Sequence, residues 1–153
     1  MQQLDCASQE VFHRLAGSTC VPVPEMCVQE PAGASRLISL GLPIVAEVAF
    51  SGSLLGVCVL SLAPHSARDL TRTLLNAPLS TPFEDSLLFD TVGEVCNMIA
   101  GSWKGRLAAP FSGSALSPPI APKASTRPRY TRLNLSRVYS FASHLLLVEL
   151  SLA

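Results

Sequence analysis

The stretch from Leu37 to Ala63 constrains the fold of this chain most, because it is 27 residues long and Glu47 is its only charged residue. Its length and hydropathy alone would permit a membrane-spanning helix. However, Ser51-Gly52-Ser53 interrupts it, and the residues before this break alternate in a way that is typical of a strand. The residues that share one strand face are Ile44, Ala46, Val48 and Phe50. We therefore predict a buried β-hairpin and no membrane segment.

The composition is that of a folded chain with no general attraction to nucleic acid. The 153 residues are 48% hydrophobic and 14% charged with a net charge of zero, which predicts one domain spanning 1–153. Residues 1–100 hold ten acids and four bases, a net charge of −6, whereas residues 101–153 hold seven bases and one acid, a net charge of +6. The basic part is either a docking feature for an acidic partner or a solvated, arginine-rich loop.

The cysteines indicate a reducing compartment. Their number, five, is odd and none are in Cys-x-x-Cys spacing, which argues against a disulfide framework and against a zinc site. Cys58 and Cys96 lie within apolar patterns and are expected in the core. The N-terminus shows no secretory signal, so we predict a cytoplasmic protein.

The order of the predicted elements favours an α+β fold, with two layers, a largely antiparallel sheet and two long helices packed on one face. Helices are predicted at 5–15, 66–75 and 82–105, and capping signatures that begin at Ser66 and Thr81 mark the start of the last two. Strands are predicted at 37–50, 54–62, 114–117, 130–141 and 144–152. Residues 17–35 and 118–128 are rich in Pro and are predicted to be loops.

The third predicted helix carries two stripes of different character. Its apolar stripe consists of Leu88, Val92, Val95 and Ile99. A second stripe, on another side, consists of Asp90, Glu94, Asn97, Gly101 and Lys104. Glu94 and Asn97 are three residues apart and share one face of the helix. Trp103 is expected to pack the helix onto the sheet. Gly93 either permits close packing or is only tolerated.

This helix resembles that of the CheC/CheX/FliY family of chemotaxis phosphatases, and of the CheX-like branch most closely. The family carries Glu-x-x-Asn followed by an apolar residue and Gly, which here reads Glu94-Val95-Cys96-Asn97-Met98-Ile99-Ala100-Gly101. Two further stretches look like the family's middle hairpin and its Ser-x-Pro strand end, and these are residues 50–56 and 116–120. The resemblance covers residues 5–153.

The resemblance implies a phosphatase that removes the aspartyl phosphate of a CheY-type response regulator in chemotaxis or two-component signalling. Asn97 would hold the attacking water, since a carboxamide can donate and accept hydrogen bonds without charge beside a phosphoryl dianion. Glu94 would pair with a lysine of the regulator. Asp90, Gly101 and Lys104 would extend the partner surface. No cofactor or metal is expected on this chain, because Mg²⁺ would come with the regulator. The family also implies a homodimer through sheet pairing.

Several alternatives remain open on the sequence. Glu94 and Asn97 could be ordinary surface residues of an amphipathic helix. The chain could be a non-catalytic adaptor that binds receiver domains, or a structural protein associated with a flagellar switch. Some family members bear a second Glu-x-x-Asn on the first helix, but here His13 stands where the Asn would be needed after Glu10. We expect that site to be absent, with Glu10 and His13 facing solvent or a partner.

Overall fold

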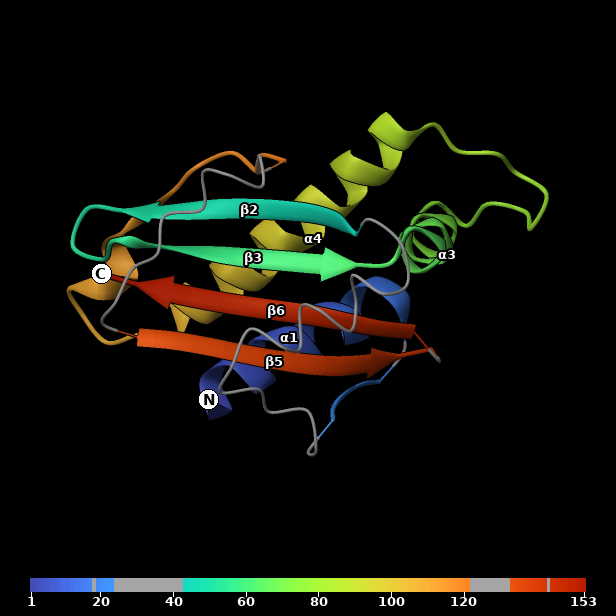
Figure 1. Ribbon diagram of the computed structural model, residues 1–153. Helices are drawn as coiled ribbons and strands as arrows, with labels where there is room; N and C mark the ends of the chain where they lie inside the picture. The colour runs from blue at the N-terminus through green and yellow to red at the C-terminus, as the bar shows by residue number, and fades with distance from the viewer. Residues whose placement is uncertain (18, 24–42, 122–132, 143) are drawn as a thin grey trace.

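The structure is a computed structural model that describes residues 1–17, 19–23, 43–121, 133–142 and 144–153. In this part of the chain an antiparallel six-stranded sheet has the order β1-β5-β6-β3-β2-β4, and α1 and α4 lie side by side on one face of it (Figure 1). The helices are α1 (Gln2–Ala16), α3 (Pro64–Leu75) and α4 (Asp85–Gly105), followed by the 3₁₀ turn η2 (Phe111–Gly113). The strands are β1 (Cys20–Pro22), β2 (Ile44–Ser51), β3 (Gly56–Leu62), β4 (Ala115–Leu116), β5 (Leu133–Phe141) and β6 (His144–Leu152). The predicted α+β class is confirmed.

The predicted hairpin is confirmed as β2 and β3, which pair from Ile44↔Leu62 to Phe50↔Gly56. The alternating side chains of β2 that were assigned to one face are all buried in the core. Residues 37–42 of the predicted first strand lie outside the described residues. Within the described part of the chain, no helix combines the length and the hydropathy that crossing a bilayer requires.

Two segments that were predicted to be loops contribute to the sheet. β1 lies within the predicted loop 17–35 and pairs antiparallel with β5. Ile120, within the predicted loop 118–128, exchanges backbone hydrogen bonds of 2.8 and 2.9 Å with Glu47 of β2. Both segments are short and rich in proline, so no periodic pattern marks them, although each forms backbone hydrogen bonds with a strand of the sheet. The remaining residues of both predicted loops, 24–35 and 122–128, lie outside the described residues.

The predicted helix starts were wrong, although the predicted ends agree. α1 begins at Gln2, three residues early, and α3 begins at Pro64 with Ala63 as its N-cap. α4 begins at Asp85, and neither α3 nor α4 has a side-chain cap. Proline fits the first helical turn, where its missing N–H is not needed, so Pro64 starts α3 before Ser66 can cap it.

The two C-terminal strands are confirmed as β5 and β6, with 130–132 outside the described residues.

The apolar stripe of α4 forms the centre of the core. Leu88, Val92, Val95 and Ile99 are all fully buried, as the 3.6-residue period predicts. Trp103 packs against Phe50 with ring centroids 5.5 Å apart, which confirms its assignment as a packing residue. Because this side of α4 faces the sheet, the stripe with Glu94 and Asn97 is turned away from it.

Candidate functional site

The outward side of α4 presents polar side chains that have no partners within the described part of the chain. Asp90 and Glu94 are exposed, and Asn97 is partly buried. None of the three makes a hydrogen bond or an ion pair with a described residue. A carboxylate and a carboxamide one helical turn apart are thus both available to a group from outside the chain.

Asn97 lies in a row of residues spaced by four along α4, between two glycines. A Cβ added at Gly93 would lie 3.1 Å from the Cβ of Pro119, and a Cβ added at Gly101 would lie 3.8 Å from Leu116. The segment 115–121 therefore runs alongside this row, and Asn97 is flanked on both sides by residues without side chains. Close approach by Pro119 explains Gly93, which the sequence left undecided.

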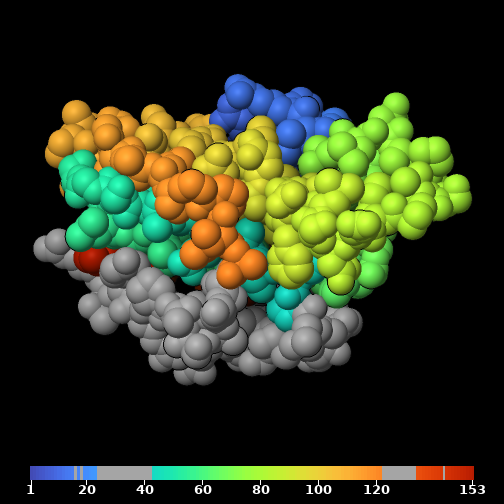
Figure 2. Space-filling model, turned by 90° about the horizontal axis from the view of Figure 1, so that it is seen from above, coloured from blue at the N-terminus to red at the C-terminus, as the bar shows by residue number. Residues whose placement is uncertain are grey.

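The segment 115–121 is held against β2 by hydrogen bonds along its length. The backbone N–H of Ser117 donates to the carbonyl of Ala49, at 2.9 Å, and the Ser117 hydroxyl oxygen accepts from the N–H of Ala49, also at 2.9 Å. Three residues later, Ile120 and Glu47 exchange their two backbone bonds. This fixed segment forms one wall beside α4, and the space-filling view shows it in orange against the yellow helix (Figure 2).

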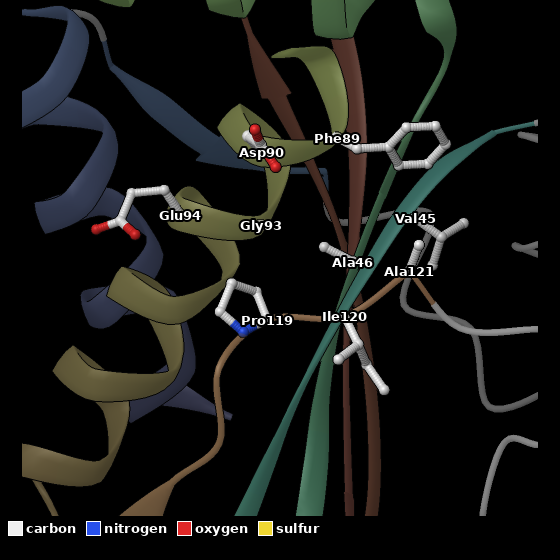
Figure 3. Close-up of a pocket in the computed structure, with 9 residues that line it drawn as sticks. All are labelled: Val45, Ala46, Phe89, Asp90, Gly93, Glu94, Pro119, Ile120 and Ala121. Atoms are coloured by element: carbon white, nitrogen blue, oxygen red, sulfur yellow. The ribbon is translucent and has the colours of Figure 1, made fainter. Parts of the chain in front are cut away.

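A groove of about 390 Å³ lies between α4, β2 and this segment. Its lining residues, shown in Figure 3, are Val45, Ala46, Phe89, Asp90, Gly93, Glu94, Pro119, Ile120 and Ala121. Asp90 and Glu94 come from α4, with the Glu94 carboxylate pointing away from Val45, Ile120 and Ala121, whereas the Phe89 ring of the same helix points toward this apolar side. The groove thus joins the acidic edge of the site to an apolar surface, a combination that the sequence did not predict.

The other two residues predicted to bind a partner make contacts within the chain. The ammonium of Lys104 donates to the carbonyl of Ser114 at 2.8 Å. Ser114 is buried, and its hydroxyl oxygen accepts from the N–H of Leu54 at 3.0 Å, so Lys104 links the end of α4 to the β2–β3 turn. A Cβ at Gly101 would meet Leu116 at an ordinary contact distance of 3.8 Å, so packing against the described residues does not require this glycine. Binding of a partner by either residue stays a prediction.

On the first helix, Glu10 does not simply face solvent or a partner, as the sequence led us to expect. Its carboxylate accepts a hydrogen bond from the Ser102 hydroxyl at 3.0 Å and pairs with Arg14 and Arg106. The hydrogen bond from Ser102, followed by that from Arg106, lowers the pKa of Glu10 below its usual value. His13 is exposed. Glu10 therefore joins α1 to the end of α4.

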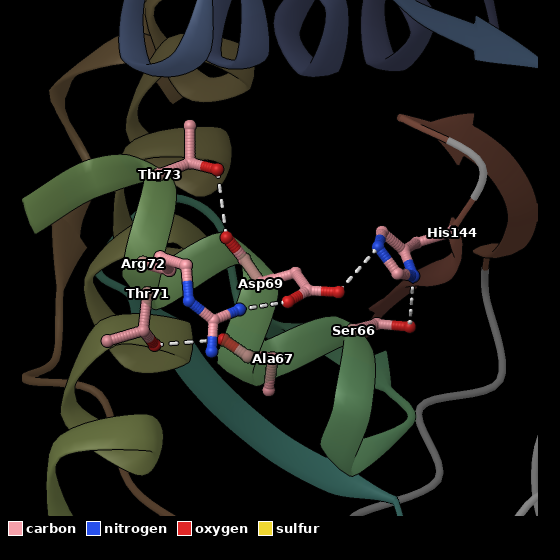
Figure 4. A network of polar contacts seen from close by, with 7 residues as sticks. All are labelled: Ser66, Ala67, Asp69, Thr71, Arg72, Thr73 and His144. Carbon is pink, nitrogen blue, oxygen red and sulfur yellow. Dashed lines mark hydrogen bonds and ion pairs between the residues drawn. The ribbon is translucent and has the colours of Figure 1, made fainter. Parts of the chain in front are cut away.

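A second polar cluster connects α3 to the start of β6 (Figure 4). His144 lies 3.2 Å from the Ser66 hydroxyl through Nδ1 and 3.1 Å from Asp69 through Nε2, and Asp69 also pairs with Arg72. The order Ser–His–Asp is that of a hydrolytic triad, but the burial is reversed. Ser66 is only 5% exposed, whereas the Asp69 side chain is 45% exposed. A substrate could not reach the hydroxyl, so this cluster is a structural link.

Metal ligands do not gather in the described part of the chain, where no group of three or more His, Cys, Asp or Glu side chains could hold an ion. Cys58 and Cys96 are buried together behind the site, as the sequence predicted, and the Cys96 thiol lies 3.5 Å from the Cys58 carbonyl oxygen. Contact with Cys96 and burial both raise the pKa of Cys58 above its usual value, which keeps this thiol neutral.

Comparison with known proteins finds one matching family model and several solved structures with a similar fold. The model of a family described as "Chemotaxis phosphatase CheX" matches residues 44–137. No curated protein matches the sequence. The chemotaxis protein CheX from Vibrio vulnificus has 16% identity and a TM-score of 0.70, with 100% of this chain and 95% of that chain covered. CheX from Desulfovibrio desulfuricans has 18% identity and a TM-score of 0.70, with 99% and 97% covered.

A third solved structure contains a partner. It is the CheX–CheY–BeF₃–Mg²⁺ complex from Borrelia burgdorferi, with 18% identity and a TM-score of 0.63, covering 99% of this chain and 96% of that chain. At these identities the structural likeness shows a shared fold. The family match covers α4 with Glu94 and Asn97, together with the segment 115–121.

Proposed function

We propose that this chain, which belongs to the family of the chemotaxis phosphatase CheX, hydrolyses the aspartyl phosphate of a CheY-type receiver domain. The match to the CheX family model confirms the family resemblance that was found in the sequence. The observation that carries the proposal is the pair Glu94 and Asn97, one turn apart on the outward side of α4 and free of partners among the described residues. The related CheX from Borrelia burgdorferi, which forms a complex with CheY, supports a receiver domain as the partner.

In this proposal Asn97 positions the attacking water. An aspartyl phosphate is already an activated acyl phosphate, so hydrolysis needs a water held in line with the phosphorus more than it needs a nucleophile from the protein. The carboxamide oxygen accepts a hydrogen bond from the water, and its NH₂ group can donate to a phosphoryl oxygen. Gly101, one turn after Asn97, leaves room on that side of Asn97 for the partner's loops, whereas Pro119 covers Gly93 on the other side.

Glu94 has the docking role. Its exposed carboxylate, one turn before Asn97, would pair with a lysine ammonium beside the phosphorylated aspartate and so fix the register of the two proteins. The proposal assigns the Mg²⁺ to the receiver domain and no cofactor to this chain. This division leaves the chain with two tasks, which are recognition of a cation and orientation of one water.

The test is the decay of a phosphorylated receiver domain with and without this protein and its Asn97→Ala variant. We expect the variant to lose at least roughly 100-fold in catalysed rate, since the oriented contact is lost. Asn97→Asp should lose as much, because a carboxylate repels the phosphoryl oxygens. Ser86→Ala, on the exposed side of the first turn of the same helix, is the control and should keep full activity.

The outcomes of this test distinguish a phosphatase from a non-catalytic adaptor that only binds the receiver domain. An Asn97→Ala variant that is folded and as active as the wild type would contradict the role of Asn97. A wild-type protein that binds the receiver without accelerating decay would be an adaptor. To separate these cases, binding should be measured in parallel on a receiver held in its active form by beryllofluoride and Mg²⁺.

A further inference from the structure

Two large apolar side chains are exposed on the groove beside the acidic edge of the site. Phe89 is 40% exposed and Ile120 is 56% exposed, and both line the same groove with Val45 and Ala121. Single exposed apolar residues are common on protein surfaces, but several that share one groove indicate a contact surface. No sequence pattern predicted this surface, because Phe89 and Ile120 are far apart along the chain.

The groove lies next to Asn97 along α4, and one of its walls is hydrogen-bonded to β2. Phe89 lies one turn before Gly93, and Gly93 lies one turn before Asn97, so Phe89 points about 80° around the helix axis from Asn97. Eight residues separate Phe89 from Asn97, which is about 12 Å along a helix axis. Ile120 is fixed on the other wall by its two backbone hydrogen bonds to Glu47. The groove therefore presents a preformed apolar surface at a set distance from Asn97.

We propose that this groove binds an apolar side chain of the receiver domain, next to a basic residue on the same segment. This inference rests on the proposed function, because it names a second anchor for the same partner. Charge supports it: Asp90 stands on the groove without a partner among the described residues, so a basic residue on the partner would meet it. Phe89 lies about 12 Å along the helix axis from Asn97, so the groove selects receivers that carry an apolar residue at a matching distance from the phosphorylation site.

The test separates affinity from turnover. Phe89→Ser and Ile120→Ser are each compared with Leu79→Ser, a control that changes an apolar side chain 86% exposed and outside the groove. Binding to a CheY-type receiver domain, held active by beryllofluoride and Mg²⁺, is measured by calorimetry. Decay of the phosphorylated receiver is measured at saturating protein. We expect each groove variant to raise Kd about tenfold or more and to keep the saturated rate within about twofold, with no change for the control.

The outcomes distinguish this inference from the proposed function. If the wild type accelerates decay and both groove variants bind like the wild type, the groove inference is overturned and the proposed function stands. If the groove variants lose affinity but the wild type does not accelerate decay, the surface is confirmed and the phosphatase activity is refuted. A wild type that neither binds nor accelerates overturns both. Since both side chains are exposed and the Ile120 contacts to Glu47 are made by backbone atoms, the variants should fold, which urea unfolding checks.

Discussion

Pro119 packs directly onto Gly93, so closely that a methyl group at Gly93 would lie 3.1 Å from the Cβ and 3.2 Å from the Cγ of the proline. This contact sets the spacing between α4 and the segment 115–121, one residue away from Glu94. Any side chain at Gly93 must push the proline outward. Movement there is restrained, because the next residue, Ile120, is hydrogen-bonded to Glu47 of β2.

We therefore predict that Gly93→Ala stabilises the protein less than Gly101→Ala does. An alanine in the interior of a helix gains about 1 kcal/mol over glycine. At Gly101 the new methyl group would meet only Leu116, at an ordinary 3.8 Å, so most of this gain should appear. At Gly93 the cost of displacing Pro119 offsets this gain in stability. Urea unfolding of the two variants checks the prediction, and equal gains in the free energy of unfolding would show that Pro119 yields freely.

The second prediction assigns Glu94 to docking rather than to chemistry. Glu94→Gln keeps the size of the side chain and removes its charge. Loss of one partner of a desolvated interfacial charge pair costs about 2 kcal/mol or more, which is roughly thirtyfold in affinity. Titration of activity against receiver concentration should show a half-saturation raised by that factor with an unchanged maximal rate. Glu84→Gln, exposed at the start of α4, is the matched control. A reduced maximal rate at normal half-saturation would move Glu94 into the hydrolytic step.

The sequence predicted those parts of the fold whose signal is local. The apolar stripe of α4 follows the 3.6-residue period and the hairpin follows the two-residue period, and both are confirmed by burial. The start of α3 was wrong because the capping signature competes with another use of the same side chain. Serine is a residue type that often caps helices, yet the Ser66 hydroxyl contacts His144, 78 residues away in the sequence.

The sequence predicted the helical part of the candidate site but not the groove beside it. Glu94 and Asn97 were found because they lie on one helix at a recognisable spacing. The groove could not be found, because Phe89 and Ile120 are brought together by the pairing of Ile120 with Glu47, which no local pattern marks. The Ser-x-Pro match at residues 116–120 indicated this segment without showing what Ser117 and Pro119 contact.

The third prediction concerns the first helix. The double variant Glu10→Ala, His13→Ala should keep phosphatase activity within about twofold, because neither residue lies on the groove. Glu10→Ala alone should lower thermal stability, since it removes the contacts to Ser102 and Arg106 that join α1 to α4. His13→Ala, which changes an exposed side chain, is the control for stability. A large loss of activity in the folded double variant would mean that the first helix also contributes to hydrolysis.

The last prediction follows from the burial of Cys20 at the edge of the sheet. Burial, and secondarily the carboxylate of Asp5, raises the pKa of this thiol from 9.0 to about 12. The folded state therefore holds the proton more tightly than the unfolded state, so its contribution to stability is complete below pH 9 and is lost as the pH rises toward 12. At pH 10.5 the loss should be about 2 kcal/mol.

The measurement compares wild type with Cys20→Ala by urea unfolding at pH 8 and pH 10.5. The wild type should lose about 2 kcal/mol more than the variant between the two pH values. The small cavity left by the substitution lowers the free energy of unfolding equally at both pH values. It therefore does not affect the difference between them. Alkylation at pH 8.5 gives an independent check: exposed Cys6 should react with iodoacetamide, while Cys20 should stay protected until urea unfolds the chain. Equal losses of stability, together with equal alkylation of the two thiols, would show that Cys20 ionises freely in the folded protein.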